Sequence, residues 1–144
     1  MKTKKTDVEF EITMEHELLN LAWFARDRAY APYSGFKVGA AIECVDGSIF
    51  VGCNIENVSY GLTICAERVA ISKAISEGKT SFKRLVVVAE GEGPFTMPCG
   101  ACRQFLAEFG MNVHVIVSND RTKFAEASLS DILPMAFLPE NLPR

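Results

Sequence analysis

Three cysteines in two short motifs constrain the fold of this chain more than any other feature. The sequence Cys-Ala-Glu starts at Cys65, and the sequence Pro-Cys-Gly-Ala-Cys contains Cys99 and Cys102. Each motif stands at the start of an expected helix, and residues three apart on a helix share a face. One ion can therefore bind all three thiolates only if two helix N-termini converge, where both helix dipoles favour ionised sulfur.

This ligand set predicts a catalytic metal. A zinc ion with three protein ligands keeps a fourth position open for water, and the pKa of that water falls from about 15.7 to about 7. Glu67 can reach the water while staying off the metal, which predicts a general acid and base. Three thiolates exceed the charge of Zn²⁺ by one. We expect Arg68 to offset this excess through hydrogen bonds to sulfur, with Arg103 as the weaker candidate.

Other readings of these cysteines remain open at this point. A Cys-x-x-Cys motif alone also fits a redox pair or a structural zinc site, and it is the additional Cys-Ala-Glu that favours catalysis. A non-catalytic module stabilised by zinc would need a fourth ligand. Cys44 and Cys53 lie on an expected hairpin and are predicted to be small apolar core residues. His16 and His114 lie far from both motifs and are predicted to be structural.

The hydrophobic pattern predicts a three-layer α/β/α sandwich with a mixed five-stranded sheet. Asp46-Gly47 favours a tight antiparallel hairpin, and a later parallel strand pair needs a crossover helix. Residues 13–144 are expected to form one domain, and residues 1–12 an extension for which disorder is an option. We expect helices at 14–29, 64–77 and 99–109, strands at 37–45, 48–54, 85–89, 113–117 and 124–127, and a helical turn at 129–133.

Composition narrows the possible partners and the compartment. Apolar residues make up 49% of the chain and charged residues 23%, as in globular proteins. The net charge is −3 and no basic stripe follows the sequence, so we expect no nucleic acid partner. The longest apolar stretch, 85–89, is far shorter than the roughly 18 residues of a membrane span. Five cysteines, an odd number, argue for reduced thiols and a cytoplasmic protein.

Further segments add a family resemblance to these motifs. Zinc deaminases in general carry a His or Cys ligand, a catalytic Glu and a later Pro-Cys-x-x-Cys. From about Glu15 to Phe137 the chain resembles the small homotetrameric cytidine deaminases. The residues that carry the resemblance are Pro32–Ala41, Asn54–Asn57, Tyr60-Gly61, Cys65–Arg68 and Pro98–Gln104.

The resemblance implies the roles of further residues. It implies one Zn²⁺ per subunit on the three cysteines, a homotetramer, and pockets completed by neighbouring subunits. Phe36 would lie against the pyrimidine ring, although a core aromatic is the simpler interpretation of that residue alone. Asn54 and Glu56 would bond the ribose, whereas their residue types fit loop capping equally well. The full set of substrate-binding residues implied is Phe36, Asn54, Glu56, Tyr60, Ala66 and Phe137.

These features together predict hydrolytic deamination of cytidine and 2′-deoxycytidine to uridine and 2′-deoxyuridine, as in pyrimidine salvage. Zinc-bound hydroxide would attack C4 while Glu67 protonates N3 and then the leaving amine. A deaminase of another aminopyrimidine, such as blasticidin S, is the alternative within the same chemistry. Met97 departs from the small polar residue more usual before this Pro-Cys motif, and it is expected to alter the pocket wall modestly.

Overall fold

The computed structural model describes the backbone of residues 2–143 and the side chains of residues 14–143. Its centre is one five-stranded mixed sheet in the order β2-β1-β3-β4-β5. Only β3 and β4 are parallel, and the other neighbours are antiparallel. The strands are β1 (Gly39–Cys44), β2 (Ile49–Cys53), β3 (Phe82–Val88), β4 (His114–Asp120) and β5 (Lys123–Ser128).

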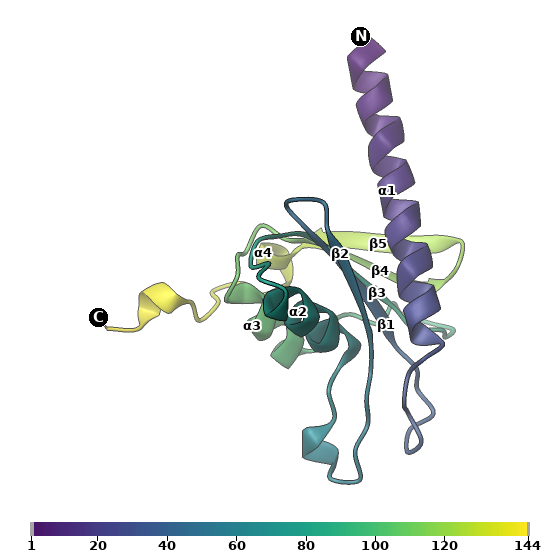
Figure 1. Ribbon diagram of the computed structural model, residues 1–144, viewed down its shortest axis with the longest axis vertical. Coiled ribbons are helices and arrows are strands. Elements are labelled where there is room, and N and C mark those ends of the chain that lie inside the picture. Colours follow the sequence, from purple (N-terminus) through teal and green to yellow (C-terminus); the bar gives the residue numbers. More distant parts are fainter. Residues whose placement is uncertain (1, 144) are drawn as a thin grey trace.

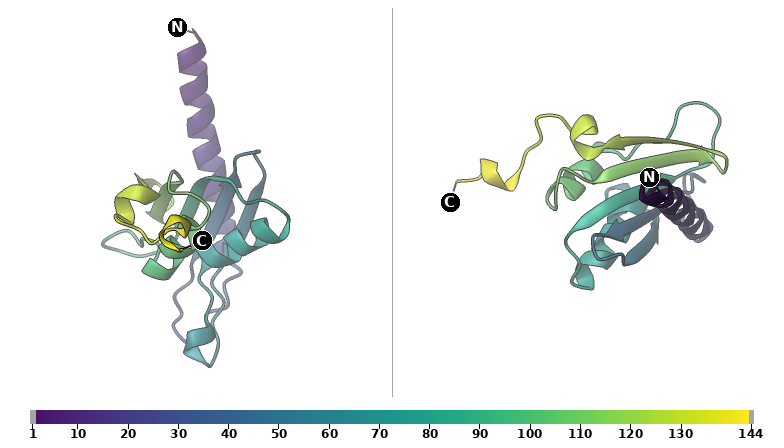
Figure 2. Two further views of the ribbon diagram at one scale, coloured as in Figure 1. Left: turned by 90° about the vertical axis from the view of Figure 1, so that its left-hand side faces the viewer. Right: turned by 90° about the horizontal axis from the view of Figure 1, so that it is seen from above.

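Helices cover both faces of this sheet, which confirms the predicted three-layer architecture (Figure 1; Figure 2). Helix α1 (Lys2–Arg26) lies on one face, and α2 (Ala66–Ser76), α3 (Gly100–Ala107) and α4 (Leu129–Ile132) lie on the other. Two single-turn helices, η1 (Tyr60–Leu62) and η2 (Pro139–Asn141), belong to loops. No helix in the described part of the chain is both long and apolar enough to cross a bilayer.

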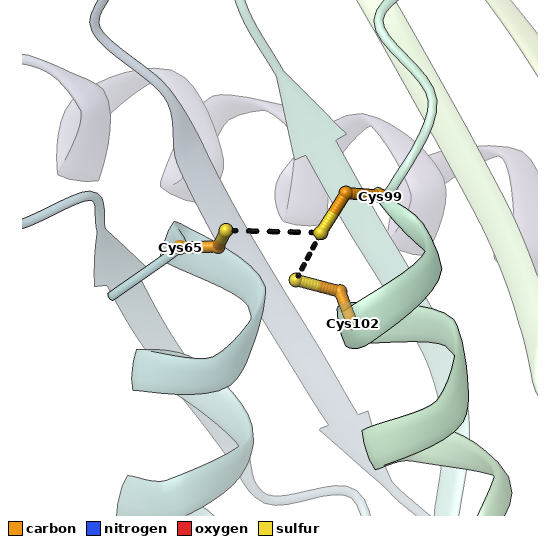
Figure 3. Close-up of side chains that lie close together, drawn as sticks. All are labelled: Cys65, Cys99 and Cys102. Carbon is orange, nitrogen blue, oxygen red and sulfur yellow. Dashed lines mark hydrogen bonds between the residues drawn. The ribbon is translucent and has the colours of Figure 1, made fainter. Parts of the chain in front are cut away.

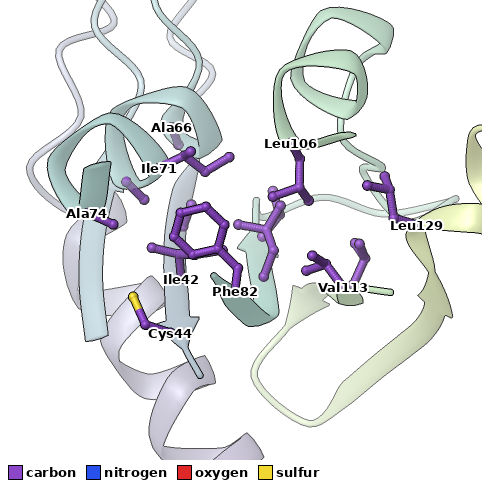
Figure 4. Packing of buried hydrophobic residues seen from close by; sticks show 14 of the residues in the cluster. Ile42, Cys44, Ala66, Ile71, Ala74, Phe82, Leu106, Val113 and Leu129 are labelled. Atoms are coloured by element: carbon purple, nitrogen blue, oxygen red, sulfur yellow. The ribbon is translucent and has the colours of Figure 1, made fainter. Parts of the chain in front are cut away.

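Each face of the sheet packs its own apolar core. Beneath α1, Leu18, Ala22 and Trp23 contact Val86 and Ile116 of the central strands. The larger core lies between the sheet and helices α2 and α3, as Figure 4 shows. The alternation of β1 supplies both faces, because successive side chains of a strand point to opposite sides. The metal-binding motifs begin the two helices that cover the larger core.

Two glycines allow helices to approach the sheet unusually closely. A Cβ on Gly39 would lie 2.0 Å from the Ala22 carbonyl oxygen of α1. A Cβ on Gly52 would lie 2.6 Å from both the Ala66 carbonyl oxygen and the Ala70 amide nitrogen of α2. Both distances are shorter than any side chain tolerates. Gly52 therefore fixes how the first turns of α2 sit on β2.

The predicted hairpin and helices are present, with shifted ends. The turn at Asp46-Gly47 joins β1 to β2, and Gly47 has a φ of 91°. Helix α1 begins at Lys2 and ends at Arg26, not at the predicted 14 and 29. It thus includes most of the segment 1–12 that the sequence set apart as an extension. Nothing in residues 2–13 stops a helix, because this segment has neither proline nor glycine.

Candidate active site

The three cysteines of the two motifs come together where α2 and α3 begin, as predicted (Figure 3). Cys65 is the N-cap of α2, Cys99 is the N-cap of α3, and Cys102 lies in the first turn of α3. Sγ of Cys99 lies 3.5 Å from Sγ of Cys102 and 3.9 Å from Sγ of Cys65. None of the five cysteines forms a disulfide. The structure therefore assembles three free thiols from segments far apart in sequence.

The spacing of these sulfurs fits one zinc ion. Zn–S bonds of about 2.3 Å at tetrahedral angles place sulfurs about 3.8 Å apart, close to the separations observed. Among residues 14–143 the group has three members, and no further His, Cys, Asp or Glu completes a four-ligand set. A closed structural site normally has four protein ligands. The cluster therefore matches an open zinc site and lacks the fourth ligand that a purely structural module needs.

A guanidinium lies beside the sulfurs. Nη2 of Arg68 lies 3.4 Å from Sγ of Cys65, in the relation expected from the sequence. A hydrogen bond from Cys102 and the contact with Arg68 lower the pKa of Cys65 to about 5, while the pKa of Cys102 rises because this thiol donates to Cys65. Arg103, the weaker candidate, donates instead to the carbonyl oxygens of Pro98 at 2.7 Å and Ile132 at 2.6 Å.

Glu67 is a buried acid beside this cluster. Only 4% of the residue is exposed, and burial is the main cause that raises the pKa of its carboxyl group. It shares the lining of one cavity of about 230 Å³ with Cys65 and Cys99. Burial away from water disfavours the charged carboxylate, so a buried carboxyl group binds a proton more readily than an exposed one. The arrangement suits a group that takes up and returns protons inside the cavity.

The remaining walls of this cavity are mostly apolar. Phe36 and Asn54, both predicted to bind substrate, lie on it together with Ala66, while the half-buried Met97 forms another part of the wall. A flat ring of the size of a pyrimidine fits a space of this volume and character. The full lining is Phe36, Val38, Asn54, Thr63, Cys65, Ala66, Glu67, Val87, Thr96, Met97 and Cys99.

A second hollow of about 290 Å³ adjoins the first. It is lined by Tyr33, Ser34, Glu56, Tyr60 and Thr63. Thr63 lines both spaces, so Glu56 and Tyr60 lie beyond the thiol cavity rather than in it. The two hollows together offer an apolar end near the sulfurs and a more polar end near Glu56.

Asn54 and Glu56 form hydrogen bonds to the loop at residues 33–38. Loop capping was one of the two roles, with sugar binding, that the sequence left open for them. Asn54 Oδ1 accepts from the Val38 amide at 2.9 Å, and its Nδ2 donates to the Phe36 carbonyl at 2.8 Å. Glu56 Oε1 accepts from the amides of Tyr33 at 2.9 Å and Ser34 at 3.1 Å. Loop capping is therefore observed, and any sugar contact would be additional to it.

The two residues expected to reach a neighbouring subunit are exposed. Tyr60 is 74% exposed and packs against Tyr33, with ring centroids 5.8 Å apart. Phe137 is 60% exposed and lies on the C-terminal segment that leaves the body of the molecule (Figure 1). Its carbonyl oxygen accepts a 2.8 Å hydrogen bond from Gln104 of α3. Phe137 lines neither hollow of its own chain.

Ser34 and Thr63 are site residues that the sequence reasoning did not single out. Ser34 lies in a turn-rich segment, and its hydroxyl contacts a carboxylate 22 positions away. Thr63 precedes the cysteine motif and accepts from the Asn57 amide at 3.2 Å. A pattern of local residue types carries no signal for such distant contacts. The only signal was that Ser34 lies within, and Thr63 between, segments that resembled the family.

The two histidines lie away from the thiols, as predicted. His114 begins β4 and contacts the Glu126 carboxylate. With Glu15 these two residues form a second group of potential ligand atoms, within 4.8 Å of one another. Lys83 and Arg84 line the same hollow, and their positive charges disfavour a bound cation. This group lies at the opposite end of β4 from the thiol cavity.

The family of the chain follows from comparison with known proteins. The family model described as the cytidine and deoxycytidylate deaminase zinc-binding region matches residues 12–118. The chain belongs to this family. The match spans both cysteine motifs and Glu67, so the zinc cofactor expected from the sequence is confirmed at the level of the family, and the thiol triad fits one ion per chain.

Individual relatives agree with this assignment. The chain is 51% identical over 119 residues to a cytidine deaminase of Sporosarcina psychrophila, which covers 82% of this chain and 87% of the relative. It is 48% identical to a probable cytidine deaminase of Dictyostelium discoideum, with 86% and 84% covered. The crystal structure of cytidine deaminase from Burkholderia pseudomallei superimposes with a TM-score of 0.80 at 47% identity, covering 85% and 98%. The predicted cytidine deaminase-like fold is therefore confirmed.

Proposed function

We propose that this protein hydrolyses cytidine and 2′-deoxycytidine to uridine and 2′-deoxyuridine, with release of ammonia. One observation carries the proposal: a buried carboxyl group, Glu67, shares a nucleobase-sized cavity with a three-thiol zinc site. The named relatives are cytidine deaminases, which supports cytidine over another aminopyrimidine. The observed three-ligand set also favours an enzyme over a module in which zinc only stabilises the fold.

In this reaction Glu67 moves every proton. Cys65, Cys99 and Cys102 would hold a zinc ion, which would supply a water molecule of lowered pKa at neutral pH. The Glu67 carboxylate accepts a proton from the water as the C–O bond to C4 forms, and it delivers a proton to N3. Glu67 then takes the second proton from the new C4 hydroxyl group and passes it to the amino group; the C4–N bond breaks, the C4 carbonyl of uridine forms and ammonia leaves. Arg68 restrains the charge of the Cys65 thiolate beside it.

Substrate recognition is divided between the two hollows. The ring lies against Phe36 and beside Ala66 in the thiol cavity, and the sugar extends past Thr63 toward Glu56. Asn54 and the Glu56 carboxylate form hydrogen bonds to a sugar hydroxyl through the donor and acceptor sites that their hydrogen bonds to the loop leave free. A hydroxyl common to ribose and deoxyribose accounts for use of both nucleosides. A net charge of −3 disfavours the binding of polyanionic nucleic acids and fits a small nucleoside as the substrate.

The proposed active form is a cytoplasmic homotetramer of a single-domain chain, with residues 13–144 as the deaminase domain. In it the exposed Tyr60 and Phe137 complete the pockets of neighbouring subunits. The exposure of two large aromatic side chains, Tyr60 on the polar hollow and Phe137 on the C-terminal segment, supports this arrangement, since such residues are enriched where surfaces associate. The products suit a role in pyrimidine salvage.

A matched pair of glutamate variants tests the reaction. Glu67→Gln should retain zinc and fold but lose roughly 10²- to 10⁴-fold in kcat, the usual contribution of general acid and base catalysis. Glu77→Gln, an exposed change at the end of the same helix, should leave kcat unchanged. Ultraviolet loss and ammonia release on addition of cytidine give the rates, and metal analysis gives the zinc content. Parental turnover by zinc-loaded Glu67→Gln would contradict the proposal.

A further inference from the structure

A single hydroxyl group joins the two hollows of the site. Ser34 Oγ donates to Glu56 Oε2 and accepts from the Phe36 amide at 3.0 Å. Glu56 lines the polar hollow and Phe36 lines the thiol cavity. The side chain of Ser34 therefore stands between a carboxylate and an aromatic residue that serve different parts of a bound nucleoside.

Hydrogen bonds, rather than burial, hold this loop. Residues 32–37 are all exposed, so little apolar packing within one chain fixes their place. The peptide of Phe36 is instead held on both sides, because its amide donates to Ser34 and its carbonyl accepts from Asn54 at 2.8 Å. Loss of either contact frees one side of the Phe36 backbone. Of the two contacts, only that of Ser34 also reaches Glu56.

The contacts on Glu56 leave little of its carboxylate free. An ionised carboxylate offers about four lone-pair sites. Two backbone amides occupy Oε1, and the Ser34 hydroxyl occupies one side of Oε2. About one acceptor site remains, on the oxygen that Ser34 orients. The hydroxyl also lowers the pKa of Glu56 more than any other neighbour, so the carboxyl group stays an acceptor.

We propose that Ser34 is a positioning residue, whose hydroxyl aims the free acceptor of Glu56 at a sugar hydroxyl and fixes Phe36 against the base. This inference rests on the proposed function, in which Glu56 binds the sugar. Ser34 itself need not touch the substrate. Its effect therefore falls on binding of the nucleoside and not on the proton transfers of Glu67.

Removal of the hydroxyl should change KM far more than kcat. For Ser34→Ala we expect KM for cytidine to rise about tenfold, which is the scale of one hydrogen bond to a charged group, while kcat stays within about threefold. Ser34→Thr keeps the hydroxyl and should restore most of the loss. The matched control is Ser48→Ala, because Ser48 bonds Asp46 through both its amide and its hydroxyl in the distant hairpin turn. That control should leave KM unchanged.

A double-mutant cycle separates this inference from the proposed function. If Ser34 acts through Glu56, Ser34→Ala should add less than threefold to KM in a Glu56→Gln background, because contacting residues couple. A normal KM in Glu56→Gln would contradict the sugar contact itself. A raised KM in Glu56→Gln with a normal KM in Ser34→Ala would overturn the role of Ser34 alone. Full additivity, or no rescue by threonine, would also overturn it.

Discussion

At the scale of single residues, the site depends on side chains whose charge is set by their neighbours. Burial raises the pKa of Glu67, and the Ser34 hydroxyl is the largest cause of the lowered pKa of Glu56. Glu56 and Glu67, both in the segment from the end of β2 through the first turn of α2, are thus prepared for opposite tasks. Glu67, with its raised pKa, can take up and return a proton in an apolar cavity, and Glu56 stays an anion that only accepts hydrogen bonds.

The state of Glu56 gives a pH prediction. Its carboxyl group should titrate below the ordinary value of 4.5 in the folded protein, and Ser34→Ala should raise the midpoint. A lowered folded pKa contributes stability that is present above the unfolded pKa and is lost as pH falls through the folded value. NMR titration of the side-chain carboxyl carbon, assigned with Glu56→Gln, measures the midpoint. A parental midpoint at or above that of ordinary glutamate contradicts the hydrogen-bonding pattern described.

Residue-level prediction from sequence succeeded where chemistry is local in the chain. The Cys-Ala-Glu motif placed a ligand and an acid two residues apart at one helix start, and α2 has that arrangement. The same reasoning missed Ser34, because its partner Glu56 comes from the far side of a hairpin. It also left two uses open for Asn54, since one amide can both hold a loop and face a cavity.

At the scale of elements, the position of α2 on the sheet controls the metal site. Gly52 lets the first turns of this helix rest on β2, and those turns carry Cys65, Glu67 and Arg68. The helix cannot shift without moving one of the three sulfurs away from the other two. Close packing is thus a condition for the metal geometry as well as for stability.

Gly52→Ala should disturb both properties. Its methyl group would meet backbone atoms of Ala66 and Ala70 at 2.6 Å, so we expect a loss of about 1–3 kcal/mol in unfolding free energy. Zinc affinity should fall as well, because α2 must move. Gly91→Ala, where a Cβ meets nothing within 4 Å, serves as the control. Urea unfolding and competition with a chelator give the two quantities. Unchanged zinc affinity in a destabilised Gly52→Ala would show that α2 does not set the geometry.

Element types followed from hydrophobic periodicity, whereas element ends did not. The prediction started β3 at Leu85, but the strand begins at Phe82 and includes Arg84. Arg84 can be buried because Glu43 lies directly opposite it on β1, with Nε of Arg84 3.6 Å from Oε1 of Glu43. A strand that buries an ion pair looks polar in sequence. Its true start is visible only after β1 and β3 are placed side by side.

At the scale of the whole molecule, large apolar side chains remain exposed near η1 and on the C-terminal segment. Besides Tyr60 and Phe137, Val58 before η1 is 76% exposed and Leu62 at the end of η1 is 66% exposed. Large apolar side chains that are this exposed are enriched where protein surfaces associate. These exposures accord with the proposed tetramer, and Tyr60 among these residues lines the polar hollow.

Subunit mixing tests whether neighbours complete each pocket. Phe137→Ala alone should lose about tenfold in kcat/KM, and Glu67→Gln alone should be nearly inactive. Hybrids of the two should regain activity above either parent, because a chain with Glu67 then receives Phe137 from its neighbour. Hybrids of Glu67→Gln with Cys65→Ser should gain nothing, since both defects lie in a chain's own cavity. If the activity of the Phe137→Ala/Glu67→Gln hybrids only equals the mean activity of the two parent variants, the proposal that neighbouring subunits share pockets is contradicted.

Helix α3 has a further consequence in such an assembly. This eight-residue helix supplies Cys102 to its own thiol cluster, and two residues later Gln104 holds the carbonyl of Phe137. In the proposed tetramer one short helix thus serves two catalytic centres, its own and a neighbour's. Loss of metal from one subunit would then slow turnover in the neighbouring subunit, so the four sites would lose activity together rather than independently.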